Sequence, residues 1–180
     1  MAVEKSGLVL RCQWEAYMEC GGPEGTNHLI GEGFTSFPES KNPKEYARKY
    51  VNDKTERTDV IGYAPSIEYS ADCISDDPVV KEIAKIHDGE LTGTATHRKV
   101  TMVNRWEESG DTCPAVQRTF AIIPGTKGEG TDALVYTGTM KAVSDLVPGT
   151  FTLSTKTFAP TGAAAASVLS ADTAPSNPKK

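Results

Sequence analysis

With 180 residues, the chain is long enough for one domain with a sizeable core and short for two. Its 19 lysines and arginines against 24 aspartates and glutamates give a net charge of −5, which argues against a phosphate-neutralising surface for nucleic acid. No apolar run approaches the roughly 20 residues that span a bilayer, and MAVEKSGLVLRCQWE has no apolar signal-peptide segment before its first charges, so we expect a soluble protein made in a cytoplasm.

The first part of the chain predicts two short strands. We expect one strand over Gly7–Trp14 and a second over Leu29–Phe37, where apolar residues alternate. Between them, CGGPEGTN at 20–27 is typical of a turn, because glycine adopts positive φ angles and proline fixes a bend. The chain therefore begins as a β protein.

The next stretch, NPKEYARKYV at 42–51, allows two interpretations. Asn42 as a cap, Pro43 at the first position and Glu45 three residues after the cap fit the start of a helix. Alternate residues also share one side of a strand: Lys44, Tyr46, Arg48 and Tyr50. Both interpretations stand from this half alone.

The stretch IGYAPSIEYS at 61–70 is less ambiguous. Large apolar residues alternate with small or polar ones over ten residues, which indicates a strand. Pro65 lacks an amide hydrogen and therefore predicts a bulge or a gap in the pairing. The nearest partner is Lys44–Val51, across the turn-like NDKTER. We therefore expect a long projecting β-hairpin over about 43–71, whose free edges invite pairing with another chain.

After the hairpin, SDDPVVKEIAKIHDGE predicts a helix over about 77–88. Asp77 can cap it, Pro78 suits its first position and Gly89 follows its end. Residues at helical spacing form one apolar stripe that should cover one end or face of a sheet: Val79, Val80, Ile83, Ala84 and Ile86.

Strands and glycine-rich loops fill the chain to about residue 158. We expect strands at Thr96–Glu107, Ala115–Ile123, Leu134–Val143 and Thr150–Thr157, loops at 108–114 and 124–132, and a turn at Pro148-Gly149. One helix among these strands is typical of an antiparallel β-sandwich or barrel with one flanking α-helix. We assign residues 1–158 to this domain, and 159–180, rich in Ala, Ser, Thr and Pro, to a low-complexity C-terminal tail or arm.

The sequence gives no indication of catalysis or metal binding. The four cysteines form no CxxC pair and are expected as free buried thiols: Cys12, Cys20, Cys73 and Cys113. The histidines His28, His87 and His97 stand apart from them, which argues against a zinc site. No GxSxG, HExxH, P-loop or dinucleotide motif occurs, and Asp76-Asp77 fits helix capping, so we expect neither an enzyme nor a cofactor.

The segment SKNPKEYARKYVNDKTERTDVIGYAPSIEYSAD at 40–72, followed by the helix DPVVKEI, resembles the tail tube proteins (major tail proteins) of long-tailed phages and prophages of Gram-positive bacteria. The combination of NPKEY, TDVxGYxPSIxYS and the helix carries the resemblance, which is closest over about 31–90 and looser to about 158. It implies a structural virion protein that assembles as hexameric rings. The rings stack into the hollow tail tube that delivers the genome, with the long hairpin lining the tube.

On this interpretation, strand alternation divides the hairpin residues between two faces. Six large side chains would pack at the subunit interface: Tyr46, Tyr50, Ile61, Tyr63, Ile67 and Tyr69. Five small or polar residues would face the lumen: Gly62, Ala64, Ser66, Glu68 and Ser70. The charged tip would contact the next ring: Asp53, Lys54, Glu56 and Arg57. A small, polar and acidic lumen lets DNA slide through without being bound.

The resemblance also implies the partners. These are further copies of the chain, a tape-measure protein, a tail terminator, and distal tail or baseplate proteins, assembled in the host cytoplasm and located in the virion tail. The alternatives are the inner tube protein of a contractile tail or a secretion system, a capsid decoration protein, or a baseplate protein. The last two would share the β-rich composition without needing a long hairpin that has a small-residue face. For the tyrosines, the alternative is half-buried packing in a monomer.

Overall fold

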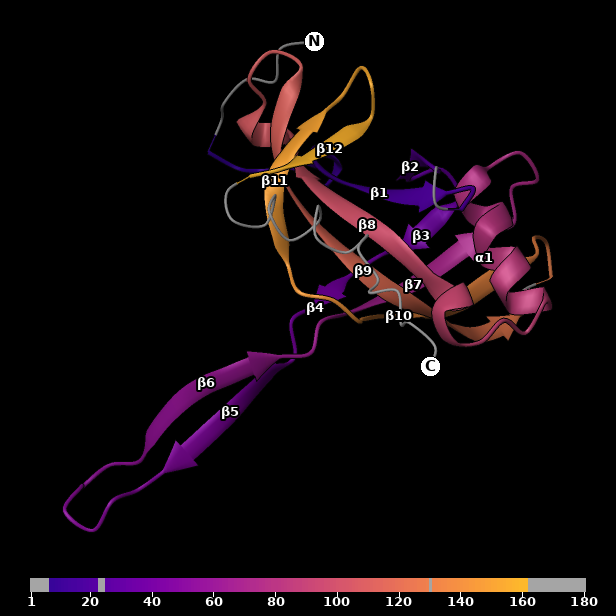
Figure 1. The fold of residues 1–180 in the computed structure, drawn as a ribbon. Helices are drawn as coiled ribbons and strands as arrows, with labels where there is room; N and C mark the ends of the chain where they lie inside the picture. Colours follow the sequence, from indigo (N-terminus) through magenta and orange to yellow (C-terminus); the bar gives the residue numbers. More distant parts are fainter. Residues whose placement is uncertain (1–6, 23–24, 130, 162–180) are drawn as a thin grey trace, which may run out of the picture.

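The structure, a computed structural model, describes residues 7–22, 25–129 and 131–161. They form a curled antiparallel sheet, one helix beside it and a hairpin that stands apart from both (Figure 1). The predicted fold class, an antiparallel β-sandwich or barrel with one flanking helix, is confirmed as a half-barrel. Most of the predicted tail, 162–180, lies outside the described residues, and Ala159 and Pro160 belong to the last strand.

Ten strands make the main sheet, in the order β2-β1-β8-β9-β10-β7-β3, with β4, β11 and β12 off this path. Their bounds are β1 (Trp14–Cys20), β2 (Thr26–Ile30), β3 (Phe34–Ser36), β4 (Glu39–Ser40), β7 (Ser66–Asp72), β8 (His97–Asn104), β9 (Thr112–Lys127), β10 (Val135–Ala142), β11 (Val147–Thr152) and β12 (Thr157–Pro160). The 16-residue β9 pairs with β8 on one side, and with β11 and then β10 on the other. This long strand therefore joins the two ends of the sheet.

The helix α1 (Pro78–Asp88) begins and ends where the sequence predicts. The carboxylate of Asp77 accepts hydrogen bonds from the amides of Val79 (2.7 Å) and Val80 (3.0 Å), which satisfies two otherwise unpaired helix donors. Four residues of the apolar stripe are buried and Ala84 is half-buried, and the helix packs on the larger hydrophobic cluster of the sheet. Arg98 on β8 donates through Nε to Glu82 at 3.1 Å, which ties the polar flank of the helix to the sheet.

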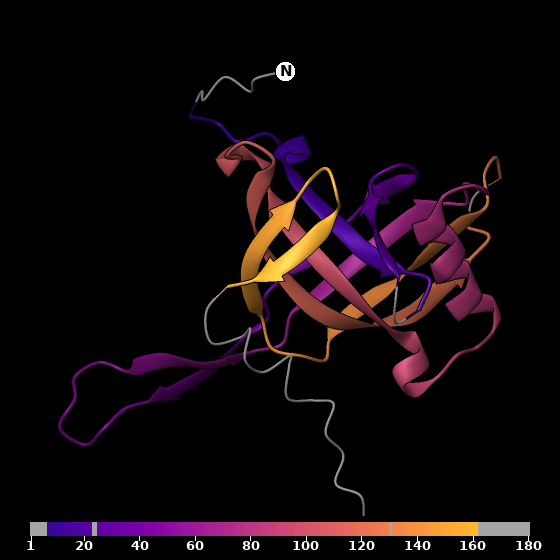
Figure 2. The same cartoon turned by 45° about the horizontal axis from the view of Figure 1, so that its top comes forward.

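Strand β1 contributes to two hydrophobic clusters because its side chains alternate between the faces of the sheet. Ala16 and Met18 pack in the larger cluster with the helix. Tyr17 points the other way, and its ring centroid lies 4.5 Å from that of Phe151 in a smaller cluster. The β11–β12 pair covers this smaller cluster at the end of the sheet away from α1 (Figure 2).

Two strand predictions near the start of the chain are wrong in position. The first strand begins at Trp14, because Arg11–Gln13 forms a 3-10 turn and only residues from Trp14 onward pair with β8. The predicted strand Leu29–Phe37 is divided into β2 and β3 by a turn in which Gly33 has a φ of 81°. The longer apolar pattern continues across this turn, so alternation alone does not reveal the break.

The predicted turn at Pro148-Gly149 lies inside β11 instead. The aromatic ring of Phe158 lies directly over Gly149, so a Cβ atom there would overlap this ring and the Ala159 carbonyl. The glycine is therefore required by close packing. The turn between β11 and β12 falls at residues 153–156. The predicted strand Thr150–Thr157 is therefore wrong, because it spans the end of β11, this turn and the first residue of β12. The loops predicted at 108–114 and 124–132 are also shorter, since β9 extends into both.

All four cysteines are free thiols, as predicted, but only Cys20 and Cys113 are buried. Cys12 and Cys73 are exposed, which corrects the expectation of burial for these two.

Tyr69 on β7 lies opposite Gly138 on β10, and its ring occupies the space that a side chain at 138 would need. Tyr69 is 3 % exposed, and its hydroxyl has no hydrogen-bond partner among the described residues. Burial raises the pKa of Tyr69 to about 12 from the ordinary value of 10.0. A buried hydroxyl without a partner reduces stability, because it has lost its hydrogen bonds to water.

We predict that Tyr69→Phe raises the free energy of unfolding by about 1 kcal/mol at pH 7, since it removes this hydroxyl and keeps the ring. Above pH 10 the unfolded chain ionises Tyr69 while the folded chain does not until about pH 12, so stability falls as pH rises through this window. Between pH 10 and 12 the free energy of unfolding of Tyr69→Phe should fall less than that of the unsubstituted protein, and the difference should reach up to about 2 kcal/mol. Urea unfolding at pH 7, 10 and 11.5 measures both effects, and a less stable phenylalanine variant at pH 7 would contradict the account.

Candidate functional site

The hairpin pairs β5 (Pro43–Arg48) with β6 (Arg57–Tyr63) in a separate two-stranded sheet. Neither strand pairs with any other described strand, so both outer edges of the hairpin are unpaired. Every residue of the two strands is exposed except Gly62, which is half-buried. Figure 1 shows the hairpin projecting away from the half-barrel.

Large apolar side chains on the hairpin are exposed: Tyr46 (41 %), Tyr50 (49 %), Val51 (110 %), Val60 (52 %), Ile61 (67 %) and Tyr63 (62 %). Two of the tyrosines have partial cover from arginines. The guanidinium of Arg48 lies 5.1 Å from the ring centroid of Tyr46, and that of Arg57 lies 5.9 Å from that of Tyr50. Burying one large apolar side chain contributes about 1.5–3 kcal/mol, so this surface has a strong tendency to become covered.

The register distributes apolar and charged residues over both faces of the hairpin. On one face Tyr63 lies opposite Pro43 and Val60 opposite Glu45, with Ile61 at a bulge between them. On the other face, Arg48 lies directly opposite Arg57. Two cations in this position repel each other. Asp53 reduces the repulsion, because its carboxylate lies 3.0 Å from Nε of Arg57.

Asn42 joins the base of the hairpin to the half-barrel. It has a φ of 44°, which asparagine tolerates better than most residues. Its carbonyl accepts from the amide of Ala64 at 3.1 Å. Its side-chain amide donates to the Ala64 carbonyl (3.1 Å) and to Oγ of Ser66 (2.9 Å). The interpretation of Asn42 as a helix cap is therefore wrong, because Pro43 begins strand β5. Asn before Pro is also a turn signal, which fits the observed role.

The predicted hairpin over 43–71 is therefore shorter, and ends at Tyr63. Pro65 is buried and cannot donate to a ladder, and the strand after it, β7, pairs with β10 of the main sheet. Ile67 and Tyr69 consequently lie in the core of the half-barrel, at 0 % and 3 % exposure. Their assignment to a subunit interface is wrong, because they are already covered within their own chain.

The structure does not bring the five predicted lumen residues onto one surface. Gly62 lies in the hairpin opposite Lys44, and Ala64 lies at the hairpin's base. Ser66, Glu68 and Ser70 alternate with the buried residues of β7, so they lie on the outer face of the main sheet. Their β10 partners are also polar: Lys141, Thr139 and Thr137.

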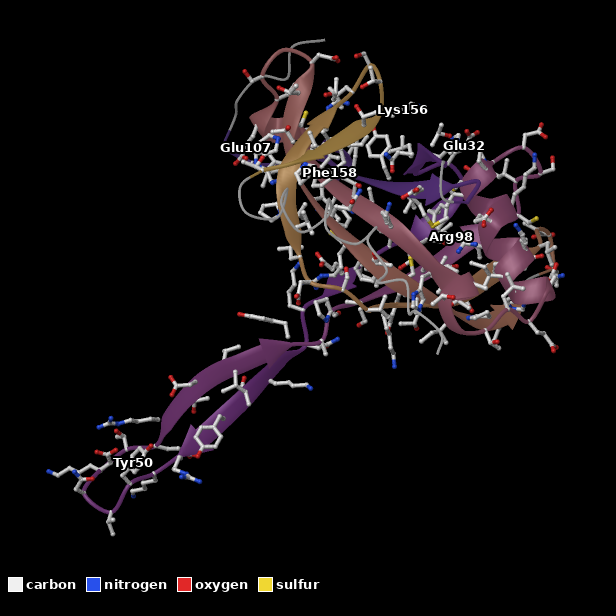
Figure 3. All side chains as sticks on the ribbon, in the orientation of Figure 1. Glu32, Tyr50, Arg98, Glu107, Lys156 and Phe158 are labelled. Atoms are coloured by element: carbon white, nitrogen blue, oxygen red, sulfur yellow. The ribbon has the colours of Figure 1, made fainter. Side chains whose placement is uncertain are left out.

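The remaining predicted site residues lie on the hairpin. Tyr46, Tyr50, Ile61 and Tyr63 are exposed there, and their place in an interface stays a prediction. Of the tip residues, Lys54 and Glu56 are exposed, Asp53 is half-buried beside Arg57, and Arg57 begins β6. Figure 3 shows Tyr50 near the distal end of the hairpin, far from the half-barrel.

Within residues 7–22, 25–129 and 131–161, no helix is long and apolar enough to cross a membrane. The same residues contain no group of three or more His, Cys, Asp and Glu side chains placed to hold a metal ion.

Comparison with known protein families finds no match for this chain, and comparison with curated proteins finds none either. Among solved structures, a matching chain comes from a complex described as the cryo-EM structure of the anti-feeding prophage (AFP) baseplate, 6-fold symmetrised. The two chains are 8 % identical with a TM-score of 0.48, and the match covers 82 % of this chain and 98 % of the other. Similarity this weak carries no argument about function.

We predict that Asn42→Ala increases amide hydrogen exchange at the base of the hairpin. The substitution removes both side-chain hydrogen bonds of Asn42, and alanine is less stable than asparagine at a positive φ. Hydrogen–deuterium exchange should show lost protection at the Ala64 amide, and the free energy of unfolding should fall by about 1 kcal/mol. Asn42→Gly keeps the backbone geometry and should show a smaller effect on exchange.

Lys41→Ala is the matched control for this prediction. Lys41 is the exposed neighbour of Asn42 and pairs with Glu39 rather than with the hairpin. Unchanged protection of Ala64 in the Asn42→Ala protein, or an equal loss in the Lys41→Ala protein, would show that Asn42 does not hold the hairpin base.

Proposed function

We propose that the chain is a structural protein of a phage tail, whose copies assemble as hexameric rings that stack into a hollow tube for genome delivery. The observation that carries the proposal is the hairpin over 43–63, which has unpaired edges and an exposed apolar surface. The hexameric ring and the tube follow from the sequence resemblance over 40–72 and the helix after it.

The hairpin has physical reasons to bind another chain. A lone two-stranded hairpin is marginally stable in water, and an unpaired edge is a template for a further strand. Its own half-barrel does not cover it (Figure 1). An interface between unlike surfaces repeats from copy to copy, and it closes into a ring or continues as a helical filament. A ring-and-stack assembly buries the hairpin of every copy.

The outer face of β7 and β10 supports a role as the wall of a conduit. Ser66, Glu68 and Ser70 lie there opposite Lys141, Thr139 and Thr137, so the face is polar and carries one acidic and one basic group. The net charge of −5 adds no general attraction for phosphates. In this proposal DNA passes without specific binding, and the protein has no catalytic role and no cofactor.

The proposal extends to partners and location. The tube protein would meet a tape-measure protein inside the tube, a terminator at one end and distal tail or baseplate proteins at the other. Copies would assemble in the host cytoplasm and remain in the virion tail.

The direct test is a variant that lacks the hairpin. The Asn42 carbonyl accepts a 3.1 Å hydrogen bond from the Ala64 amide. The same carbonyl-to-amide bond closes a β-turn when only two residues lie between its partners. Replacing 43–63 by Gly-Gly should therefore give a folded half-barrel. We predict a thermal unfolding midpoint close to that of the full chain, and a monomer in sedimentation velocity at concentrations where the full chain assembles.

A point variant tests whether assembly depends on the apolar surface of the hairpin when the whole segment is still present. Ile61→Asp places a charge at an apolar residue that is 67 % exposed, and should also prevent assembly. Thr94→Asp, at an exposed polar position of the half-barrel outside the hairpin, is the matched control and should assemble. Assembly by the Gly-Gly protein would refute a role for the hairpin, and unfolding of that protein would show that the hairpin belongs to the core.

A further inference from the structure

A groove of about 380 Å³ lies between the two edge strands β2 and β3. Its lining includes Leu29, Ile30, Phe34 and Phe37 from these strands and their flanks, together with Trp14. Arg11, Cys12 and Glu15 contribute the N-terminal wall. The groove therefore marks the place where the half-barrel stays open.

The strands on both sides of this groove are the two end strands of the main path of the sheet. Among the described strands, β2 pairs with β1 alone and β3 with β7 alone. Each strand consequently has one unpaired edge. A strand from another chain can pair with such an edge through its main chain while its side chains enter the groove.

The floor of the groove is aromatic. The ring centroid of Phe37 lies 6.3 Å from that of Trp14 and 6.0 Å from that of Phe34, which meets it edge-on. The guanidinium of Arg11 lies 4.7 Å from the Trp14 ring centroid. Leu29, on the groove wall, is 42 % exposed. These groups suit large apolar and aromatic side chains, which gain both area burial and ring contacts.

Apolar side chains are also exposed in the residues that come just before the groove wall in the sequence. Leu8, Val9 and Leu10 lead into Arg11 and are 74 %, 48 % and 55 % exposed. Three consecutive exposed aliphatic residues form a larger apolar surface than scattered single residues provide. Nothing in the described part of the same chain covers it.

The hairpin 43–63 matches this groove in chemistry. It presents three tyrosines and three aliphatic residues, and both of its edges are unpaired. It carries five basic and four acidic side chains, whereas the whole chain has a net charge of −5. A slightly basic hairpin is therefore attracted to the acidic remainder of another copy. Glu32, exposed in the turn between β2 and β3, follows the groove residue Gly31, and Figure 3 shows it on the side of the molecule opposite the hairpin.

The geometry excludes an intramolecular contact in this arrangement. Figure 1 shows the hairpin projecting away from β2 and β3. At about 3.3 Å per residue, the segment from Pro43 to Val51 extends about 30 Å beyond its base, which is enough to reach into a neighbouring molecule. The occupant that fits is the hairpin of a second copy.

We propose that the groove between β2 and β3 is the receptor for the hairpin of a neighbouring copy. This inference rests on the proposed function and adds the acceptor surface to it. The donor is the hairpin and the acceptor is the groove, and each copy carries both. The interface is therefore heterologous, and every added copy presents one unused hairpin and one unused groove.

Two variants that each lack one surface test this pairing. The groove variant carries Leu29→Lys and Ser36→Lys, which place two charges at exposed groove positions without touching the aromatic floor. The hairpin variant has 43–63 replaced by Gly-Gly. Thr94→Lys, exposed in the turn at 93–96 and outside both the groove and its edge strands, is the matched control and should assemble like the unsubstituted protein.

Each variant alone should stay monomeric in sedimentation velocity. An equimolar mixture should form a 1:1 dimer that does not grow, because it contains one intact hairpin–groove pair and no second one. Circular dichroism and thermal unfolding establish that each variant is folded before mixing.

Three results would overturn the proposal. If the unsubstituted protein assembles and the groove variant assembles equally well, the hairpin docks elsewhere and the proposed function survives. If both folded variants are monomeric and the mixture gives no dimer, hairpin and groove are not partners. If the unsubstituted protein forms no assembly at any concentration and the mixture gives no dimer, the proposed function and this inference fail together.

Discussion

Pro65 has no amide hydrogen, so no hydrogen-bonded ladder can run unbroken from Arg57 to Asp72. The residue is buried, and its carbonyl accepts from the amide of Ala142 at 3.0 Å, which fixes the chain where β7 joins β10. On the other side of the break, Asn42 closes the base of β5 and β6. This junction divides one long alternating segment between a buried sheet and an exposed hairpin.

The division gives the two parts different requirements. The half-barrel buries its own apolar residues. The helix α1 covers one cluster and the β11–β12 pair covers the other, and Met18, Phe120 and Met140 are fully buried. The hairpin does not, because its tyrosines and aliphatic residues remain in water and its edges remain unpaired. The groove at the open edge of the half-barrel also has apolar lining residues and strand edges that no described residue covers. A molecule with a self-sufficient core and two incomplete surfaces is suited to repeated assembly.

Features set by neighbouring residues were predictable from the sequence. The helix is one such feature, since Asp77 and Pro78 act at its first turn and Gly89 acts at its last. The hairpin is another, since β5 and β6 are close in sequence. Alternation at 61–70 predicted strand structure, but a period of two does not reveal which sheet a strand joins, and Ile67 and Tyr69 were misassigned for that reason. The groove was not predictable, because Trp14 and Phe37 meet only after the sheet curls.

The central claim is that copies of this chain build a hollow tube through their hairpins. Electron microscopy of the purified full-length protein over a range of concentrations, with sedimentation on the same samples, tests it most directly. The account predicts rings and tubes with a central channel and six-fold cross-sections, and density for each hairpin inside the contact between copies. A protein that stays monomeric at every concentration, or that forms filaments without a channel, would contradict it.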